Sequence, residues 1–211
     1  MKDTKTRILN AAEKLFSEQG IGATSLRSIT AEAGVNLASI HYHFGSRENL
    51  ILRVFERRLG PINAERLNLL NEFGQRAGNS AIPLEKIIEA FIRPPLFCED
   101  AIDDLPASFV QLIGRMHSEP KETQHLLMSL FGDVITSFIA ELKKALPEQS
   151  EKDLFWNLKF SIGVLGIVLV GEETFRQVLE PELTQNRQAT LERMVAFIAA
   201  GFRSSGDSPK S

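Results

Sequence analysis

Hydrophobic residues recur along most of the chain at intervals of three and four positions, and almost nowhere at intervals of two. Because an α-helix makes one turn in about 3.6 residues, this spacing gathers apolar side chains on one helical face. Near the start, Ile8, Ala12 and Phe16 share such a face, and Gly20 is placed to end the helix. The pattern predicts an all-α protein of about nine helices.

Two short helices joined by a tight turn are predicted next. Either Thr24 or Ser25 can cap the first of them with its hydroxyl. Gly34 permits the bend that follows, and Asn36 is expected to cap a second helix over Leu37–Phe44. This order of elements is that of a helix-turn-helix.

The rest of the chain is predicted to be helical, with prolines or glycines between most of the segments. The expected helices cover residues 46–73 (capped by Ser46), 83–98, 105–118, 121–146, 150–178 and 184–203. Residues 204–211 are rich in serine, glycine and proline, and we expect this tail to be disordered.

The helix predicted over residues 37–44 has two different faces. We expect its inner face, with Leu37, Ile40 and Phe44, to pack in the core. Its outer face combines small with hydrogen-bonding side chains: Ala38, Ser39, His41, Tyr42 and His43. Small residues let a helix enter the major groove of DNA, and hydroxyl and imidazole groups can reach phosphates or base edges. The pattern favours a recognition helix over the alternative, an ordinary helical hairpin.

Two arginines stand near helix starts, where the helix dipole disfavours a cation. Arg47 is the first residue after the predicted Ser46 cap, and we expect it to hold a DNA phosphate. Arg27, near the start of the second helix, is expected to contact a base. Solvated surface arginines are the alternative for both.

The stretch TSLRSITAEAGVNLASIHYHFGSRENL, residues 24–50, resembles the DNA-binding domain of the TetR family of bacterial regulators. The resemblance is close over residues 5–55, whereas the remainder agrees only in length and helical architecture. It implies a DNA-binding domain over residues 1–46 and a ligand-binding and dimerisation domain over residues 47–203. The DNA contacts that it implies are Arg27, Asn36, Leu37, Ala38, Ser39, His41, Tyr42, His43 and Arg47.

Two of those positions depart from the family's usual residues. His41 stands where tyrosine is commoner, and Arg47 replaces the usual lysine. Both substitutions keep a hydrogen-bonding or cationic group, so the two residues can still contact DNA. The operator sequence stays open.

Three stretches resemble a subgroup of that family similar to PsrA, which responds to fatty acids. They are GVNLASIHYHFGSRENL, ERRLGP ending at Pro61, and DLFWNLKFSIG at residues 153–163. The resemblance implies a long-chain fatty acid or its coenzyme A thioester as effector.

A nearly continuous apolar run covers residues 155–170, and its two glycines allow another helix to approach closely. The last helix carries a matching apolar stripe, and two such helices from each of two chains would form a four-helix bundle. The interface of this expected homodimer comprises Phe160, Gly163, Gly166, Ile167, Leu191, Met194, Val195, Ile198 and Phe202. Burial within one protomer is the alternative.

Fourteen phenylalanines accompany one tyrosine and one tryptophan, which favours an apolar ligand over a sugar or a nucleotide. The residues expected to line the cavity are Phe91, Phe97, Phe109, Leu112, Ile113, Met116, Leu127, Phe131, Val134 and Phe138. Ordinary core packing is the alternative for each of them. Arg93 and Arg115 are possible partners of an anionic head group.

Composition narrows the class of protein further. The 211 residues carry a net charge of −3, and 43% are hydrophobic, as in a soluble globular protein. A single cysteine, Cys98, fits a reducing compartment, and the longest apolar run is too short for a membrane span. No pattern indicates a catalytic, metal or cofactor site. We expect a cytoplasmic DNA-binding repressor released by an apolar effector; a DNA-binding activator or architectural protein without an effector, and a helical lipid carrier, remain open.

Overall fold

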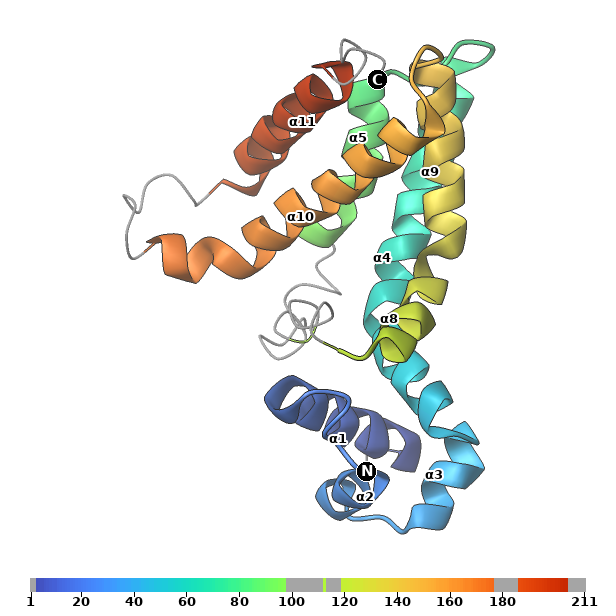
Figure 1. Cartoon of the computed structure of the whole chain (residues 1–211), viewed down its shortest axis with the longest axis vertical. Helices are drawn as coiled ribbons and strands as arrows, with labels where there is room; N and C mark the ends of the chain where they lie inside the picture. The colour runs from blue at the N-terminus through green and yellow to red at the C-terminus, as the bar shows by residue number, and fades with distance from the viewer. Residues whose placement is uncertain (1–2, 98–111, 113–118, 177–185, 205–211) are drawn as a thin grey trace. The chain divides into compact units, whose positions relative to one another are not determined.

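The computed structural model describes residues 3–97, 112, 119–176 and 186–204, and these residues form helices without any strand (Figure 1). The helices are α1 (Thr4–Gln19), α2 (Leu26–Ala33), α3 (Leu37–Phe44), α4 (Arg47–Ala77), α5 (Leu84–Phe97), α8 (Lys121–Met128), α9 (Gly132–Ala145), α10 (Glu151–Arg176) and α11 (Arg187–Ser204), with the 3₁₀ turn η2 (Ser129–Phe131). The all-α fold is confirmed. The helix predicted over residues 105–118, apart from Leu112, and the tail beyond Ser204 lie outside the described residues.

The chain divides into two compact units. The first comprises Met1–Pro61 and Asp103–Gly132, and the second comprises Ile62–Ile102 and Asp133–Ser211. α4 contributes to both, and Pro61, inside this helix, is the last residue of its part in the first unit. The functional boundary expected after residue 46 stays a prediction; it lies at the start of α4.

Side-chain caps define where the helices of the first unit begin. Ser25 caps α2: its hydroxyl accepts from the backbone N–H of Ser28 at 3.0 Å, and the Ser28 hydroxyl accepts from the N–H of Ser25. The alternative cap, Thr24, instead donates its hydroxyl to the carbonyl oxygen of Gly20 at 2.8 Å. Asn36 caps α3, as predicted, with its Oδ1 2.9 Å from the N–H of Ser39.

Gly34 forms the turn of the helix-turn-helix in a left-handed backbone conformation with φ 63°. The Arg7 side chain closes over this turn and donates to the carbonyl oxygens of Ala33, at 2.6 Å, and Gly34, at 3.0 Å. A Cβ atom at Gly34 would lie 2.9 Å from the Arg7 guanidinium. Glycine is therefore required here for the backbone angle and for the approach of Arg7.

The core of the first unit joins α1–α3, the blue helices of Figure 1, to the start of α4. Phe16 of α1 and Phe55 of α4 are completely buried in it. A buried carboxylate adds to this packing, because Glu13 of α1 pairs with both Arg57 and Arg58 of α4. The start of α4 is thereby fixed to the three-helix head.

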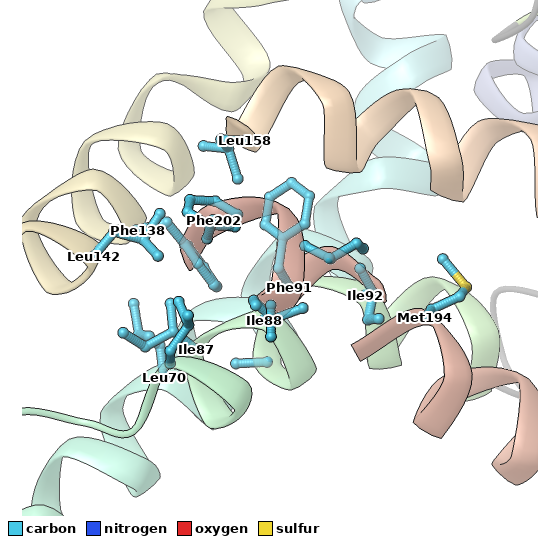
Figure 2. Close-up of a cluster of buried hydrophobic side chains, with 14 of the residues drawn as sticks. Leu70, Ile87, Ile88, Phe91, Ile92, Phe138, Leu142, Leu158, Met194 and Phe202 are labelled. Carbon is cyan, nitrogen blue, oxygen red and sulfur yellow. The ribbon is translucent and has the colours of Figure 1, made fainter. Parts of the chain in front are cut away.

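The core of the second unit brings together five helices (Figure 2). α5 packs along α11, and the side chains between the helices include Leu70, Ile87, Ile88, Phe91, Ile92, Phe138, Leu142, Leu158, Met194 and Phe202. Phe91 of α5 meets Phe138 of α9 edge to face, with 5.2 Å between ring centroids.

One stretch, Lys121–Ala145, is long and apolar enough to cross a membrane by length and composition alone. It contains the 3₁₀ turn η2 and contributes Val134, Phe138 and Leu142 to the buried core of the second unit. A single stretch of this kind is weak evidence for a membrane segment.

Candidate nucleic-acid interface

α3 places a small inner face in the core and a broad outer face in solvent. Ile40 and Phe44 are buried, as predicted. The prediction for Leu37 was wrong, since 42% of its surface is exposed. Ile40 and Phe44 make the contacts of α3 with the core of the first unit. Leu37, directly after the Asn36 cap, lies at the edge of that core. Leu37 is thus available to a partner of α3.

The outer face of α3 is dominated by Tyr42, which is 86% exposed. Ala38 and His41 are exposed beside it, and Ser39 and His43 are half-buried. The rings of Tyr42 and His43 meet edge to face at 5.0 Å. This face offers a phenol and two imidazoles, which suits hydrogen bonding to a polar partner.

Two predicted DNA contacts also serve the start of α3. Asn36 Oδ1 accepts from both the N–H and the hydroxyl of Ser39, each at 2.9 Å. The pair therefore fixes the orientation of the first turn of the helix. Their role in DNA contact stays a prediction.

Arg47 is engaged within the protein. Its Nη2 donates to the carbonyl oxygens of Ile21, at 2.5 Å, and Thr24, at 2.7 Å, in the turn between α1 and α2. These carbonyl groups explain why an arginine stands at the unfavourable start of α4. Arg27 of α2, by contrast, is exposed. The expected hold of Arg47 on a phosphate stays a prediction, and Arg27 is the freer of the two cations.

Glu119 holds the same turn from another side. Its two carboxylate oxygens accept from the backbone N–H groups of Ile21, at 2.8 Å, and Gly22, at 3.0 Å. The turn is thus bound through its carbonyls by Arg47 and through its amides by Glu119. Sequence reasoning missed Glu119, because 97 positions separate it from Gly22 and no local pattern marks it.

The residues expected to line one ligand cavity lie in two separate cores. Phe91, Val134 and Phe138 are buried in the second unit, with Phe97 packed at the edge. The remainder of the described set, Leu112, Leu127 and Phe131, belongs to the core of the first unit, and a ligand contact for any of these residues stays a prediction. Each compact unit buries its own apolar side chains, and their sequence pattern does not distinguish the two. Phe109, Ile113 and Met116 lie outside the described residues.

Among the described residues, the apolar core beside Phe91 is closely packed. A cavity of about 10 Å³, enough for a single water molecule, is bordered by Ile87, Ile88, Phe91, Ile92, Phe138, Leu142, Leu158, Ser161 and Phe202. An apolar ligand larger than this must displace side chains to enter at this point.

A buried cation stands beside that core. Arg66 of α4 is only 5% exposed, and its guanidinium carbon lies 4.3 Å from the centroid of the Phe91 ring. Its Nε donates to the carbonyl oxygen of Phe91 at 2.8 Å, and its Nη1 donates to Asn63 Oδ1 at 3.0 Å. Burial lowers the pKa of Arg66 to about 10. Sequence reasoning missed this residue, although Ile62 and Leu70, four positions to either side, place it on the buried face of α4.

The residues predicted to form the dimer interface differ in burial between α10 and α11. Phe160 and Ile167 of α10 are 60% and 63% exposed, and an added Cβ at Gly163 or Gly166 would meet no atom of the chain within 4 Å. The stripe on α11 is different, because four of its five residues are buried against the protomer's own core: Leu191, Met194, Ile198 and Phe202. For these four the expected interface role does not hold; Val195 is half-buried.

The exposed face of α11 instead carries Phe197, which is 69% exposed. The stripe predicted from sequence was the largest apolar face of α11, and that face covers α5. Phe197 lies on another side of the helix, directly after Ala196 and three positions before Ala200. A large aromatic residue among small ones was the signal in the sequence that could have indicated an exposed apolar site there.

In the part of the chain that the structure describes, no three histidine, cysteine, aspartate or glutamate side chains gather as metal ligands. His125 lies in α8, whereas Cys98 and His117 are outside the described residues.

Comparison with known proteins identifies the family. Residues 8–54 match the model of bacterial regulatory proteins of the tetR family, and residues 89–201 match a tetracyclin repressor-like C-terminal domain. Because the second match covers more than half of the chain, the protein belongs to the TetR family. The helix-turn-helix head and the helical C-terminal domain are the two parts that these models describe.

Individual relatives agree with this assignment. The transcriptional regulator AcrR of Shigella flexneri is 38% identical over 55 residues, which are 26% of each chain. The regulator LmrA of Bacillus subtilis is 28% identical over 122 residues, or 56% of this chain and 61% of LmrA. The match thus spans about a quarter of AcrR.

A solved structure shares the fold over nearly the whole chain. It is that of the fatty acid degradation regulator FadR from Bacillus halodurans, with a TM-score of 0.63 and 14% sequence identity. The superposition covers 96% of this chain and 98% of FadR. At this identity the likeness establishes the fold alone.

Proposed function

We propose that this protein is a homodimeric, ligand-responsive transcriptional repressor, which binds a palindromic operator in the cytoplasm and is released by an apolar effector. The observation that carries the proposal is the outer face of α3, with Tyr42 almost fully exposed on a helix that follows a helix-turn-helix bend. Such a helix is suited to the major groove.

In this proposal α3 is the reading element of the head. Ala38 and Ser39 let the first turn approach the groove, and His41, Tyr42 and His43 supply hydrogen bonds to phosphates or base edges. Arg27 adds a cation beside them, while Arg47 and Asn36 set the geometry of the helix that reads.

The second copy is proposed to bind through α10 and α11. Trp156, Phe160, Gly163 and Ile167 recur at intervals of three and four positions along one exposed face of α10. Phe197 gives α11 an exposed aromatic of its own. Large exposed apolar groups on adjoining helices are typical of an interface between subunits, and a two-fold dimer matches a palindromic operator.

A long-chain fatty acid or its coenzyme A thioester is the effector that we propose. The apolar lining of the second unit, the resemblance to the fatty-acid-responsive subgroup and the shared fold with a regulator named for fatty acid degradation support it. The effector releases DNA only if it binds more tightly to the DNA-free state, so effector and operator must oppose each other reciprocally.

One observation favours a second candidate. The cavity of about 10 Å³ suits a DNA-binding activator or architectural protein that has no effector and a solid core. No observation favours the helical lipid carrier.

Fluorescence anisotropy on the DNA upstream of the protein's own gene separates these functions. The titration is run at fixed salt with unlabelled competitor, because phosphate contacts alone give salt-sensitive binding without sequence preference. We expect selective binding that a long-chain acyl ligand reverses. Selective binding that the ligand leaves unchanged points to the effector-free regulator, and unselective binding overturns the proposal.

A further inference from the structure

Arg66 has an unusual electrostatic environment. It is 5% exposed, yet no carboxylate among the described residues lies within ion-pair distance of it. Two other arginines with little exposed surface, Arg57 and Arg58, share the carboxylate of Glu13. A buried charge without an opposite charge is costly, so its presence calls for a reason.

The packing of α5 explains only the hydrogen bond that Arg66 donates through Nε. In α5 the carbonyl oxygen of Phe91 would normally accept from the N–H four residues later, but that residue is Pro95, which has none. Arg66 Nε supplies the missing donor. A neutral donor would serve this carbonyl equally well, and the guanidinium retains further N–H groups on Nη1 and Nη2 that no hydrogen bond within the described residues uses.

The surroundings suit a molecule with one charged end and an apolar body. The guanidinium lies over one side of Phe91, and Phe91 in turn contacts Phe138 in the apolar core (Figure 2 shows the two rings). A cation and a continuous apolar surface are thus joined through a single aromatic ring. An arginine binds a carboxylate or a phosphate through two parallel hydrogen bonds, and the planar carboxylate is the smaller of these two groups.

We propose that Arg66 anchors the carboxylate of an amphipathic acid whose hydrocarbon chain enters the core beside Phe91 and Phe138. The inference rests on the proposed effector-binding function and sharpens it: the free acid is preferred to the coenzyme A thioester, which has no carboxylate on its acyl chain and carries its charges on the phosphates of the bulky coenzyme. Arg66 lies on α4, the helix that also begins at the DNA-binding head. Binding here therefore acts directly on a helix that both units share.

The test compares decanoate, decan-1-ol and decanoyl-coenzyme A, each below its micellar concentration, by calorimetric titration of the full-length protein. We expect the wild-type protein to bind decanoate about tenfold or more tightly than decan-1-ol. In Arg66→Met the preference for the acid disappears. Arg76→Met is the control, since Arg76 also lies over a phenylalanine, Phe73, but pairs with Glu72, and it keeps the preference.

Several results would overturn the inference: equal affinity of the wild-type protein for acid and alcohol, no binding of decanoate, tighter binding of the thioester, or an unchanged preference in Arg66→Met. If Arg66→Met fails to fold, Arg66→Gln, which keeps N–H donors without the charge, replaces it and is expected to lose the preference for the acid; a retained preference would overturn the inference. Operator binding by the ligand-free wild-type protein is measured separately. Its absence would overturn the proposed function while the acid preference stands, so the two failures are distinguishable.

Discussion

Arg27 and Arg47 both lie close to α3, but they differ in what their guanidinium groups contact. Arg47 donates to two carbonyl oxygens of the turn between α1 and α2, whereas Arg27 is exposed. We predict that Arg47→Met lowers the free energy of unfolding by about 1–3 kcal/mol, because those carbonyls lose their donor. Arg27→Met changes it by less than about 0.5 kcal/mol, as usual for a surface site.

Operator binding completes this comparison. Arg27→Met is expected to weaken binding although the protein is as stable as the wild type, whereas Arg47→Met weakens it together with stability. Denaturant titration and anisotropy measure the two quantities on the same samples. An Arg47→Met protein of undiminished stability that binds the operator poorly would instead assign Arg47 to a phosphate.

Tyr42 is the strongest test of the reading face. Its side chain is almost entirely in solvent, so Tyr42→Ala should leave thermal unfolding unchanged while operator affinity falls about tenfold. Tyr42→Phe removes the hydroxyl and keeps the ring, so it should lose only the operator affinity that a hydrogen bond supplies. Full operator affinity in Tyr42→Ala would exclude α3 as the reading helix.

Local features of single residues were predictable from the sequence. The caps at Asn36 and Ser46 act over three positions, and the burial of Ile40 and Phe44 follows from helical period. Arg66 and Glu119 were not predictable, because their partners lie 25 and 97 or more positions away. Only the fold brings those groups together.

Among the elements, the turn between α1 and α2 depends on Glu119. Glu119→Gln keeps the size of the side chain but has a single acceptor oxygen for the two N–H groups of Ile21 and Gly22. We predict a loss of about 1–3 kcal/mol in the free energy of unfolding, measured by denaturant titration. Glu65→Gln, on an exposed part of α4, is the control and stays near the wild-type value. Equal stability of the two variants would contradict the prediction.

The pair α5 and α11 provides a prediction about pH. The hydrogen bond from Arg203 holds the pKa of Glu85 below its ordinary value of 4.5. A carboxylate with a lowered pKa in the folded state stabilises the protein above pH 4.5, and this contribution disappears as the pH falls through the folded-state pKa. Because both side chains are about half exposed, we expect only about 0.2–1 kcal/mol at neutral pH.

The measurement is the difference in unfolding free energy between the wild-type protein and Glu85→Gln at several pH values. The wild-type advantage should shrink toward zero on acidification below pH 4.5, and also in high salt, which screens exposed charges. A difference that is constant from pH 7 to pH 3 would mean that the ion pair contributes nothing to stability.

α11 also shows where a periodic pattern stops being informative. The stripe of Leu191, Met194 and Ile198 correctly identified an apolar helical face, but α5 of the same chain covers it. Hydrophobic period reports that a face is covered; it contains no information on whether the cover is the same chain or a partner. Exposure within the folded protomer, as at Phe197, is what distinguishes the two.

In the whole molecule, the proposed repressor must act as a dimer, and Gly163 tests this with little disturbance of the protomer. An added Cβ there would meet no atom of the chain within 4 Å, and leucine favours a helix by about 1 kcal/mol over glycine. We predict that Gly163→Leu folds normally but keeps the partner's helix at a distance. Sedimentation should then report monomers, and operator affinity should fall at least about tenfold, because two linked heads bind far better than one. Gly132→Leu, at the start of α9 and equally unobstructed, is the control and should remain dimeric. A dimeric Gly163→Leu protein would assign the interface to another surface.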